Sequence, residues 1–283
     1  MADRGSREYE GAGAQRVEVI RSKGDQSQEV MDSVAAEEPL TLFYNGDELV
    51  SLLCTPQHKR ELAVGFMYGE GLLGTKEDIL TVAVDDQRRA VFVETVEDRP
   101  LERELLGKGT ITSGCGRGST FSLSLGSVGL APIPVPSPDA GPKPLCAAAD
   151  ITSLMRSFQR SGELFLATGG THCVALAEPG QGLIIVREDV GRHNALDKIV
   201  GHCLLAGVEP SNMVLLTTGR VSSEILLKTA RARVPILVSR SAPTSLALEY
   251  ALELGVTVVG FARGERMNIY TYPRRIARPW RSS

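Results

Sequence analysis

Apolar and polar residues alternate along the first part of the chain in a way that is typical of β-strands. The alternation begins at Val17 and Val19, and two later apolar runs, residues 40–44 and 48–54, flank Asn45-Gly46. Asn-Gly between two such runs is the strongest short-range signal of a β-hairpin, because both residues tolerate a positive φ angle. The pattern therefore predicts a hairpin centred on Asn45-Gly46.

The next segment changes from strand periodicity to helix periodicity. Thr55-Pro56 opens a segment in which apolar residues recur at helical spacing, at Leu62, Ala63, Phe66 and Met67. Residues 79–84 and 90–96 then predict a second hairpin. Together these elements predict a small α+β domain over residues 15–130, preceded by a disordered N-terminus over residues 1–14.

A proline-rich stretch follows. Prolines recur between Pro132 and Pro144, and such a segment is stiff, extended and poor at pairing. We interpret residues 131–145 as a linker between two domains.

The second half of the chain, residues 146–283, alternates strands with helices. Strands are predicted at about 172–178, 182–188, 213–218, 235–239, 256–261 and 268–271, and helices at about 150–162, 194–205, 222–233 and 243–255. Asn194 followed by Asp197 resembles a capping box at the start of the second helix. Strands separated by such helices predict an α/β domain with a largely parallel sheet and helices on both of its faces.

Three polar turns follow predicted strands, at residues 189–193, 217–220 and 239–243. In open parallel sheets the ligand pocket forms outside the carboxyl ends of the strands, and right-handed crossovers bring these three turns to one edge. Each turn also leads into a helix N-terminus, which attracts anions. A fourth basic turn, residues 261–266, follows the last parallel strand and joins the same edge.

Arginines in these turns indicate the class of ligand. Arg192, Arg220 and Arg240 can each bind a phosphate in bidentate fashion. We therefore predict a site for a phosphate-bearing ligand at this edge. The alternative is that each arginine pairs with an acidic residue on the surface.

Composition and charge exclude several classes of protein. The 283 residues are enough for two domains, and the net charge of −3 argues against a general nucleic-acid binder. No apolar run approaches the roughly 18 residues of a membrane span. The five cysteines include no Cys-x-x-Cys pair, a usage that fits a reducing cytoplasm. We expect a cytoplasmic protein that binds neither nucleic acid nor membrane.

One cysteine, Cys115, differs from the others in its surroundings. It lies at residues 112–119 among glycines, serines and Arg117, with almost no apolar neighbour. Such a loop is predicted to be reachable by solvent, and Arg117 favours the reactive thiolate. The alternative is a flexible linker that happens to contain a cysteine. Three other cysteines fall on predicted apolar faces and are expected in the core: Cys54, Cys173 and Cys203.

Several segments resemble the FdhD/NarQ family of formate dehydrogenase accessory sulfurtransferases. The most specific is residues 186–198, which contains Arg-Glu-Asp-Val-Gly-Arg-His-Asn. The others are residues 38–40, 45–46, 61–66, 168–172, 241–247 and 260–271. The resemblance covers roughly residues 15–275. It implies a three-layer, cytidine deaminase-like C-terminal domain beside the smaller α+β N-terminal domain.

The resemblance also implies an activity. Family members take sulfur from a cysteine desulfurase as a persulfide and pass it to the molybdenum cofactor of formate dehydrogenase, Mo-bis(molybdopterin guanine dinucleotide). In this chain Cys115 would carry the sulfur, and the cofactor would be a bound substrate, with no tightly bound metal of the protein's own. The family's nucleotide-binding segment maps onto Phe261, Ala262, Arg263, Gly264, Glu265 and Arg266.

The cysteine loop departs from the family pattern. The family often has Cys-Gly-x-Cys, whereas Gly118 stands here in place of the second cysteine. A mechanism that forms a disulfide within the loop is therefore excluded, but a persulfide relay on one cysteine is not. A chaperone that binds the cofactor without sulfur chemistry stays an alternative function.

Two further alternatives concern His193 and the fold. His193 could donate to a phosphate or protonate a leaving thiolate, or it could simply fix its loop through hydrogen bonds. A zinc deaminase is rejected because the sequence has neither His-x-Glu nor Pro-Cys-x-x-Cys. The sequence leaves homodimerisation open.

Overall fold

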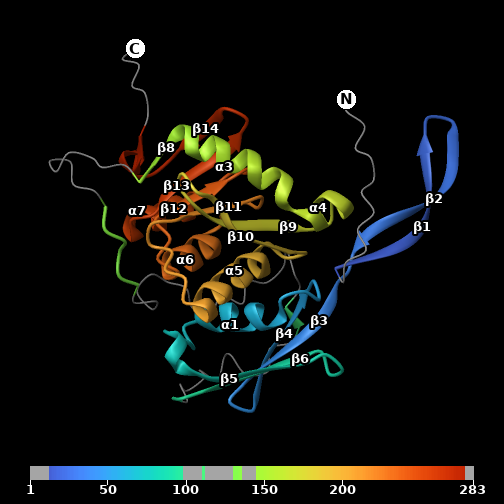
Figure 1. Ribbon diagram of the computed structural model, residues 1–283, viewed down its shortest axis with the longest axis horizontal. Helices are drawn as coiled ribbons and strands as arrows, with labels where there is room; N and C mark the ends of the chain where they lie inside the picture. The colour runs from blue at the N-terminus through green and yellow to red at the C-terminus, as the bar shows by residue number, and fades with distance from the viewer. Residues whose placement is uncertain (1–12, 98–109, 112–129, 136–144, 278–283) are drawn as a thin grey trace.

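The first half of the chain forms a five-stranded sheet covered on one face by a helix. The computed structural model describes residues 13–97, 110–111, 130–135 and 145–277 (Figure 1). The strand order is β5-β6-β3-β4-β7. The strands are β3 (Glu38–Tyr44), β4 (Asp47–Cys54), β5 (Ile79–Asp85), β6 (Ala90–Thr95) and β7 (Thr110–Ile111), and a 3-10 turn, η1 (Lys76–Asp78), precedes β5.

Both hairpins predicted for this half are confirmed. β3 and β4 meet at Asn45 and Gly46, whose φ angles are 48° and 89°. Helix α1 (Lys59–Gly69) packs its apolar residues on this sheet. The helix begins at Lys59 and not at Thr55-Pro56, because Thr55 is hydrogen-bonded to Asp189 and His58 has a left-handed φ of 58°.

The second half contains a six-stranded sheet with the order β10-β9-β11-β12-β13-β14. Its strands are β9 (His172–Glu178), β10 (Gly182–Asp189), β11 (Val214–Thr217), β12 (Ile236–Ser239), β13 (Thr257–Arg263) and β14 (Arg266–Ile269). The main helices are α3 (Ala148–Ser161), α5 (Arg192–Ala206), α6 (Ser223–Arg231) and α7 (Ser245–Leu254). Short elements that the sequence did not predict are α4 (Glu163–Thr168), β8 (Cys146–Ala147), η2 (Pro273–Arg275) and β15 (Ile276–Ala277).

The prediction of a largely parallel sheet was wrong. β12 is parallel to β11 and β13, but β9 is antiparallel to both β10 and β11, and β14 is antiparallel to β13. The reason is local: β9 and β10 are joined by a tight turn that contains Gly180 at φ 81°, with no helix between them. β10, β11, β12 and β13 nevertheless run in the same direction, because β10 and β11 are both antiparallel to β9.

Helices cover both faces of this sheet, which confirms the α/β class (Figure 1). α3 packs on one face against Ala175, Leu216 and Val238, whereas α5, α6 and α7 pack on the other against Leu176, Leu215 and Leu237. The alternation of buried residues along each strand follows from the two-residue period of β-structure. The closer likeness to cytidine deaminases stays a prediction.

The prediction of a capping box at the start of α5 was wrong. The helix begins at Arg192, with Gly191 as its N-cap and no side-chain cap. The Asn194 side chain instead donates to the carbonyl of Leu53 and to Asp189, and Asp197 pairs with Lys228. Long-range polar contacts have therefore replaced the local one.

The two halves meet where α1 crosses α5. A Cβ atom added to Gly65 would lie 1.8 Å from the Asp197 carbonyl oxygen, and one added to Gly201 would lie 1.9 Å from that of Glu61. The two backbones therefore touch, which only glycine permits at these positions. The division of the chain into two domains stays a prediction, and most of the predicted linker, residues 136–144, lies outside the described residues.

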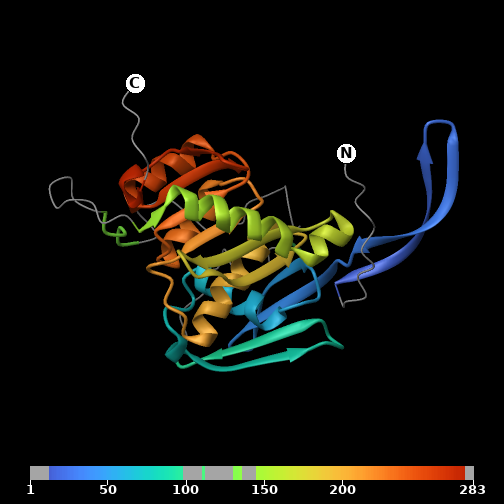
Figure 2. The same cartoon turned by 45° about the horizontal axis from the view of Figure 1, so that its top comes forward.

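A long hairpin projects from the first half (Figure 2). It consists of β1 (Ala14–Lys23) and β2 (Gln26–Ala35), paired in register from Ala14 with Ala35 to Lys23 with Gln26. The sequence predicted β1 from Val17 and Val19. It did not predict β2, because Gln26-Ser-Gln-Glu29 lacks apolar alternation.

Candidate functional site

The three polar turns predicted to share an edge do lie together. Asp189, at the end of β10, pairs with His172 at the start of β9. Thr217 and Ser239, at the ends of β11 and β12, pair with each other. The carboxyl ends of these strands are therefore adjacent at one edge of the six-stranded sheet.

A pocket of about 430 Å³ opens at this edge. Arg240 and Arg263 line it from the ends of β12 and β13, and Gly169 and Gly170 line it from the turn that follows α4. None of the lining residues that the structure describes is acidic: they are Phe165, Gly169, Gly170, Thr171, His172, Val190, Thr218, Arg240, Ser241 and Arg263. Its charge therefore favours an anionic ligand.

Hydrogen bonds fix the turns around the pocket. The Ser239 hydroxyl donates to the Gly219 carbonyl at 2.6 Å and accepts from the Ser241 N–H at 2.9 Å. Arg263 Nε donates to the Arg240 carbonyl at 3.1 Å. Within the described part of the chain, neither Arg240 nor Arg263 forms an ion pair with an acid. For these two residues this argues against the alternative that each arginine pairs with an acidic residue on the surface.

Arg192 and Arg220 lie beside the pocket without lining it. Arg192 packs against Gly219, where an added Cβ would lie 3.2 Å from the Arg192 Cβ. Arg220 is exposed. Burial lowers the pKa of His172, and the positive charges of Arg192 and Arg220 lower it further. The edge is therefore electropositive beyond the two arginines that line the pocket.

The surroundings of His193 argue against a role as a proton donor. Its Nε2 atom lies 3.0 Å from a carboxylate oxygen of Glu224. Burial lowers the pKa of His193 to about 3, and the positive charges of Lys228 and Arg192 add to that effect. The ring is therefore neutral near pH 7 and is a poor acid for a leaving thiolate.

Residues 261–266 span the end of β13, a turn at Gly264 and Glu265, and the first residue of β14, and they differ in exposure. Phe261 is 37% exposed, has a left-handed φ of 51°, and donates its N–H to the Ser241 carbonyl. Ala262 is buried in the core. Gly264, Glu265 and Arg266 are exposed and do not line the pocket. The structure therefore brings only Arg263 from this segment into the pocket.

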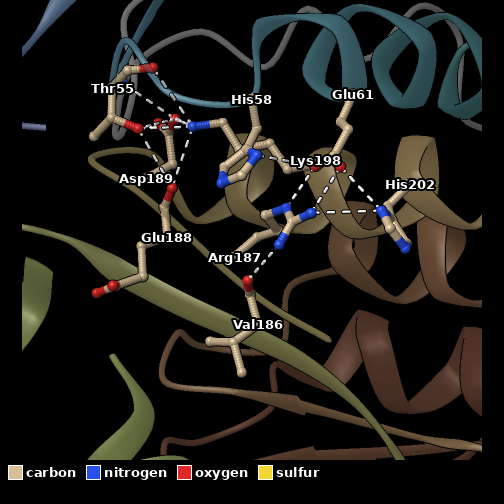
Figure 3. A network of polar contacts seen from close by, with 9 residues as sticks. All are labelled: Thr55, His58, Glu61, Val186, Arg187, Glu188, Asp189, Lys198 and His202. Atoms are coloured by element: carbon tan, nitrogen blue, oxygen red, sulfur yellow. Dashed lines mark hydrogen bonds and ion pairs between the residues drawn. The ribbon is translucent and has the colours of Figure 1, made fainter. Parts of the chain in front are cut away.

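A buried network behind the pocket was missed by the sequence analysis (Figure 3). The Asp189 carboxylate accepts hydrogen bonds from the Thr55 N–H and hydroxyl at 3.1 Å and from Lys198 Nζ at 2.6 Å. The side chains of Asp189 and Lys198 are both 0% exposed. The Arg-Glu-Asp-Val-Gly-Arg-His-Asn string contains Asp189, and the sequence indicated a family resemblance and an anion-binding turn there but not these buried contacts.

A second network joins α1 to β10 and α5 (Figure 3). Arg187 binds Glu61 through two hydrogen bonds of 2.5 and 2.7 Å, and His202 Nδ1 lies 2.9 Å from the same carboxylate. Burial raises the pKa of Glu61, but the hydrogen bonds from Arg187 and His202 outweigh it and lower the pKa overall. His58, the residue before α1, is 42% exposed and lies 3.6 Å from Glu61.

Four of the five cysteines are buried, which confirms the prediction for Cys54, Cys173 and Cys203 and adds Cys146. Burial raises the pKa of Cys54, Cys146 and Cys203 to about 12 and raises that of Cys173 further. These thiols therefore stay protonated near pH 7 and are poor nucleophiles. Cys115 and the rest of residues 112–119 lie outside the described residues.

The described residues offer neither a candidate membrane-spanning helix nor a candidate metal site. Their helices include none with the length and apolar character that crossing a membrane requires. Their histidines, cysteines, aspartates and glutamates do not gather in threes or more in a way that could hold a metal ion.

Comparisons with known proteins agree in pointing to one family. The model of the FdhD/NarQ family matches residues 35–277. The chain is 38% identical to the sulfur carrier protein FdhD of Bacillus subtilis (strain 168) over 263 residues, which cover 92% of this chain and 96% of the relative. It is 40% identical to the protein of the same name from Bacillus pumilus over 245 residues, 87% of this chain and 90% of the relative.

A solved structure extends the likeness to three dimensions. The crystal structure of a proposed formate dehydrogenase accessory protein from Desulfotalea psychrophila superposes with a TM-score of 0.74 at 28% sequence identity. The match covers 93% of this chain and 99% of the other. From the family model, the relatives and this likeness, we conclude that the chain belongs to the FdhD/NarQ family.

Proposed function

We propose that this protein is a sulfurtransferase of formate dehydrogenase maturation. It accepts sulfur from a cysteine desulfurase as a persulfide on Cys115 and passes it to Mo-bis(molybdopterin guanine dinucleotide). The observation that carries the proposal is the state of the other thiols: Cys54, Cys146, Cys173 and Cys203 are buried and have raised pKa values. In a family whose relatives are named sulfur carriers, Cys115 is therefore the candidate for the carrier.

Loading of Cys115 is an exchange between sulfur atoms. The Cys115 thiolate attacks the outer sulfur of the donor persulfide, the bond between the two donor sulfurs breaks, and the donor cysteine leaves as a thiolate. Cys115 then carries the outer sulfur as its own persulfide. Release of that sulfur as sulfide consumes two electrons, which two external thiol groups supply as they are oxidised to one disulfide; Cys115 is left as a thiol.

The basic edge suits the second substrate. The cofactor contains two guanine dinucleotides and therefore several phosphates, and arginine binds phosphate through paired hydrogen bonds. Arg240 and Arg263 line the pocket, and Arg192 and Arg220 lie beside it. We propose that this pocket receives a phosphate of the cofactor and that the segment at residues 261–266 contributes to the same site.

The position of β7, which directly precedes the cysteine loop, supports a short distance between Cys115 and this pocket. Ile111 pairs with Leu52 of β4, and Thr55, three residues beyond Leu52 and directly after the strand, is hydrogen-bonded to Asp189. Val190, the next residue, lines the pocket. Cys115 is four residues beyond Ile111, so the chain between them spans at most about 14 Å.

The test is to load the protein and locate the added sulfur. After incubation with a cysteine desulfurase and cysteine, mass spectrometry should find a mass increase of one sulfur atom on Cys115. Cys115→Ala should abolish it, and Cys203→Ala, which removes a buried thiol, should leave it intact. Wild-type protein that gains no sulfur would contradict the proposal and favour a chaperone that binds the cofactor without sulfur chemistry.

A further inference from the structure

Among the described residues that line the pocket, His172 is the only one whose side chain titrates near neutral pH. It is the first residue of β9 and is partly exposed. Its backbone is held in place, because it pairs with Asp189 of β10 and because Cys173, the next residue, donates its N–H to the Thr218 hydroxyl at 3.0 Å. The sheet therefore places this histidine at the pocket.

The imidazole of His172 has no hydrogen bond or ion pair with any other residue that the structure describes. The other three histidines each lie 2.9–3.6 Å from a carboxylate oxygen: they are His58, His193 and His202. Among the histidines, His172 is therefore the one whose ring nitrogens are available to a ligand.

Asp189, which lies opposite His172 in the sheet, already has partners for both of its carboxylate oxygens. One oxygen accepts the Gly191 N–H at 2.9 Å. The other accepts hydrogen bonds from Lys198 Nζ at 2.6 Å and from the Thr55 hydroxyl at 3.1 Å (Figure 3). The carboxylate therefore serves the buried network, where Lys198 balances its charge.

Glu188, the other acid at the end of β10, also serves the fold. Its carboxylate accepts the backbone N–H groups of Leu164 and Phe165 at 2.9 and 2.7 Å and the Thr171 hydroxyl at 3.3 Å. These bonds fix the start of α4 and leave neither acid of β10 as a partner for the imidazole of His172.

Positive charge dominates the surroundings of His172. Burial and the charge of Arg192 lower the pKa of His172, Asp189 opposes this shift, and Arg220 adds to it. The neighbouring His193 is neutral near pH 7 and contributes no charge. Without an anion beside it, the imidazole of His172 is therefore neutral near pH 7. A bound anion reverses this balance, because a nearby negative charge favours the protonated ring.

We propose that His172 binds the phosphate that enters the pocket and that its imidazole takes up one proton from solvent as the phosphate binds. The protonated ring donates an N–H to a phosphate oxygen, a bond that is stronger than its neutral counterpart, beside Arg240 and Arg263. The inference rests on the proposed function only in taking a phosphate as the ligand of this pocket. It adds a contact that depends on pH: loss of the proton weakens the hold on the ligand.

Proton uptake is measured best with a ligand that does not itself titrate. GDP-mannose is such a probe, because both of its phosphates are esterified and lack the second ionisation that a terminal phosphate has at about pH 6. Calorimetry of the full-length wild type in buffers of different ionisation enthalpy should show uptake of at least about half a proton per ligand at about pH 7. His172→Gln should take up none. His58→Gln, which removes a histidine outside the pocket, should match the wild type. Equal uptake in the wild type and His172→Gln, or none in the wild type from about pH 6 to about pH 8, would overturn the inference.

The pH dependence of the affinity separates a titrating contact from a merely structural one. Because the ring is protonated in the complex and neutral in the free protein, the affinity of the wild type should fall by up to about tenfold per pH unit as the pH rises through the pKa of the complex. His172→Gln should bind at least about tenfold more weakly at about pH 6 and should show no such fall. A loss of affinity in His172→Gln that is the same at every pH would contradict proton uptake.

Nitrogen NMR of the histidine rings tests the same point without altering the pocket. The signal that is missing from His172→Gln identifies the ring in the wild type. At about pH 7 it should be that of a neutral imidazole in the free protein and that of a charged one with saturating GDP-mannose. A ring that stays neutral in the complex would overturn the inference.

Arg240→Ala distinguishes failure of this inference from failure of the proposed site. If the wild type does not bind GDP-mannose, or Arg240→Ala binds it equally well, the phosphate site fails and the role of His172 fails with it. If Arg240→Ala binds it weakly but the wild type takes up no proton, only the role of His172 fails.

Discussion

The junction between α1 and α5 and the pocket edge are both rich in charge, but they use it differently. At the junction, Lys198 and Lys228 are buried and each contacts a carboxylate, that of Asp189 or Asp197, at 2.6–2.7 Å. Burial of a charge is tolerated only with such a partner. At the edge, by contrast, Arg240 and Arg263 line a pocket without an acid among its described residues.

This difference separates residues that hold the fold from residues that are available to a ligand. The paired charges at the junction are satisfied within the protein, and the helix backbones there touch at Gly65 and Gly201. The arginines at the edge are held in position by the backbone, as in the bond from Arg263 to the Arg240 carbonyl. We therefore expect substitutions at the junction to change stability and substitutions at the edge to change binding.

Gly65→Ala should have the largest effect on stability. The new methyl group would lie 1.8 Å from the Asp197 carbonyl oxygen, so α1 and α5 must separate and disturb the networks on both sides. We expect a loss of about 3–5 kcal/mol in the free energy of unfolding, the range of severe core substitutions, measured by chemical denaturation.

Gly24→Ala is the control for the loss of a glycine. An added Cβ there meets nothing within 4 Å, although the φ of 60° strains it. Its cost should be about 1 kcal/mol. Equal costs at the two glycines would contradict the close helix contact.

Glu70 should make the junction sensitive to pH. Burial raises the pKa of this carboxyl group to about 7, a shift that Asp197 adds to and Lys228 opposes. Because the folded-state value lies above the unfolded value, its contribution to stability is complete at low pH and is lost as the pH rises from about 4.5 to 7. Relative to Glu70→Gln, the wild type should therefore lose about 3 kcal/mol across this window and nothing more above it.

Denaturation at several pH values measures the difference between the two proteins. The comparison with Glu70→Gln removes groups that titrate in both. Glu77→Gln, at an exposed acid, is the matched control and should track the wild type. A gap between wild type and Glu70→Gln that stays constant from pH 4.5 to 8 would show that Glu70 titrates normally.

The sequence predicted local features well and long-range contacts poorly. Asn45-Gly46 and the periodicity of residues 172–261 located hairpins, strands and helices, because these signals act over a few residues. The direction of β9 was missed because it depends on which strands pair. Asp189 was assigned to an anion-binding turn, whereas its hydrogen bonds go to Thr55, more than a hundred residues away in the chain.

The candidate site was likewise predicted in part. The common edge followed from the strand–turn–helix order, which places Arg240 and Arg263 together. The sequence did not indicate that Ala262 is buried or that His193 lies beside Glu224, because both depend on packing between distant segments. The role of Cys115 stays a prediction.

Replacing the pocket arginines should have the smallest effect on stability and a clear effect on binding. Both side chains line the pocket, and the charge-assisted hydrogen bonds that each would make to a phosphate contribute about 1.5–3 kcal/mol. Arg240→Ala and Arg263→Ala should each weaken binding of GDP about tenfold or more by calorimetry. The free energy of unfolding should change by less than about 0.5 kcal/mol, as at other surface sites. Arg274→Ala, which removes an exposed arginine outside the pocket, should bind GDP as the wild type does. Equal affinity in all three variants would place the phosphate site elsewhere and remove the contrast between the junction and the edge.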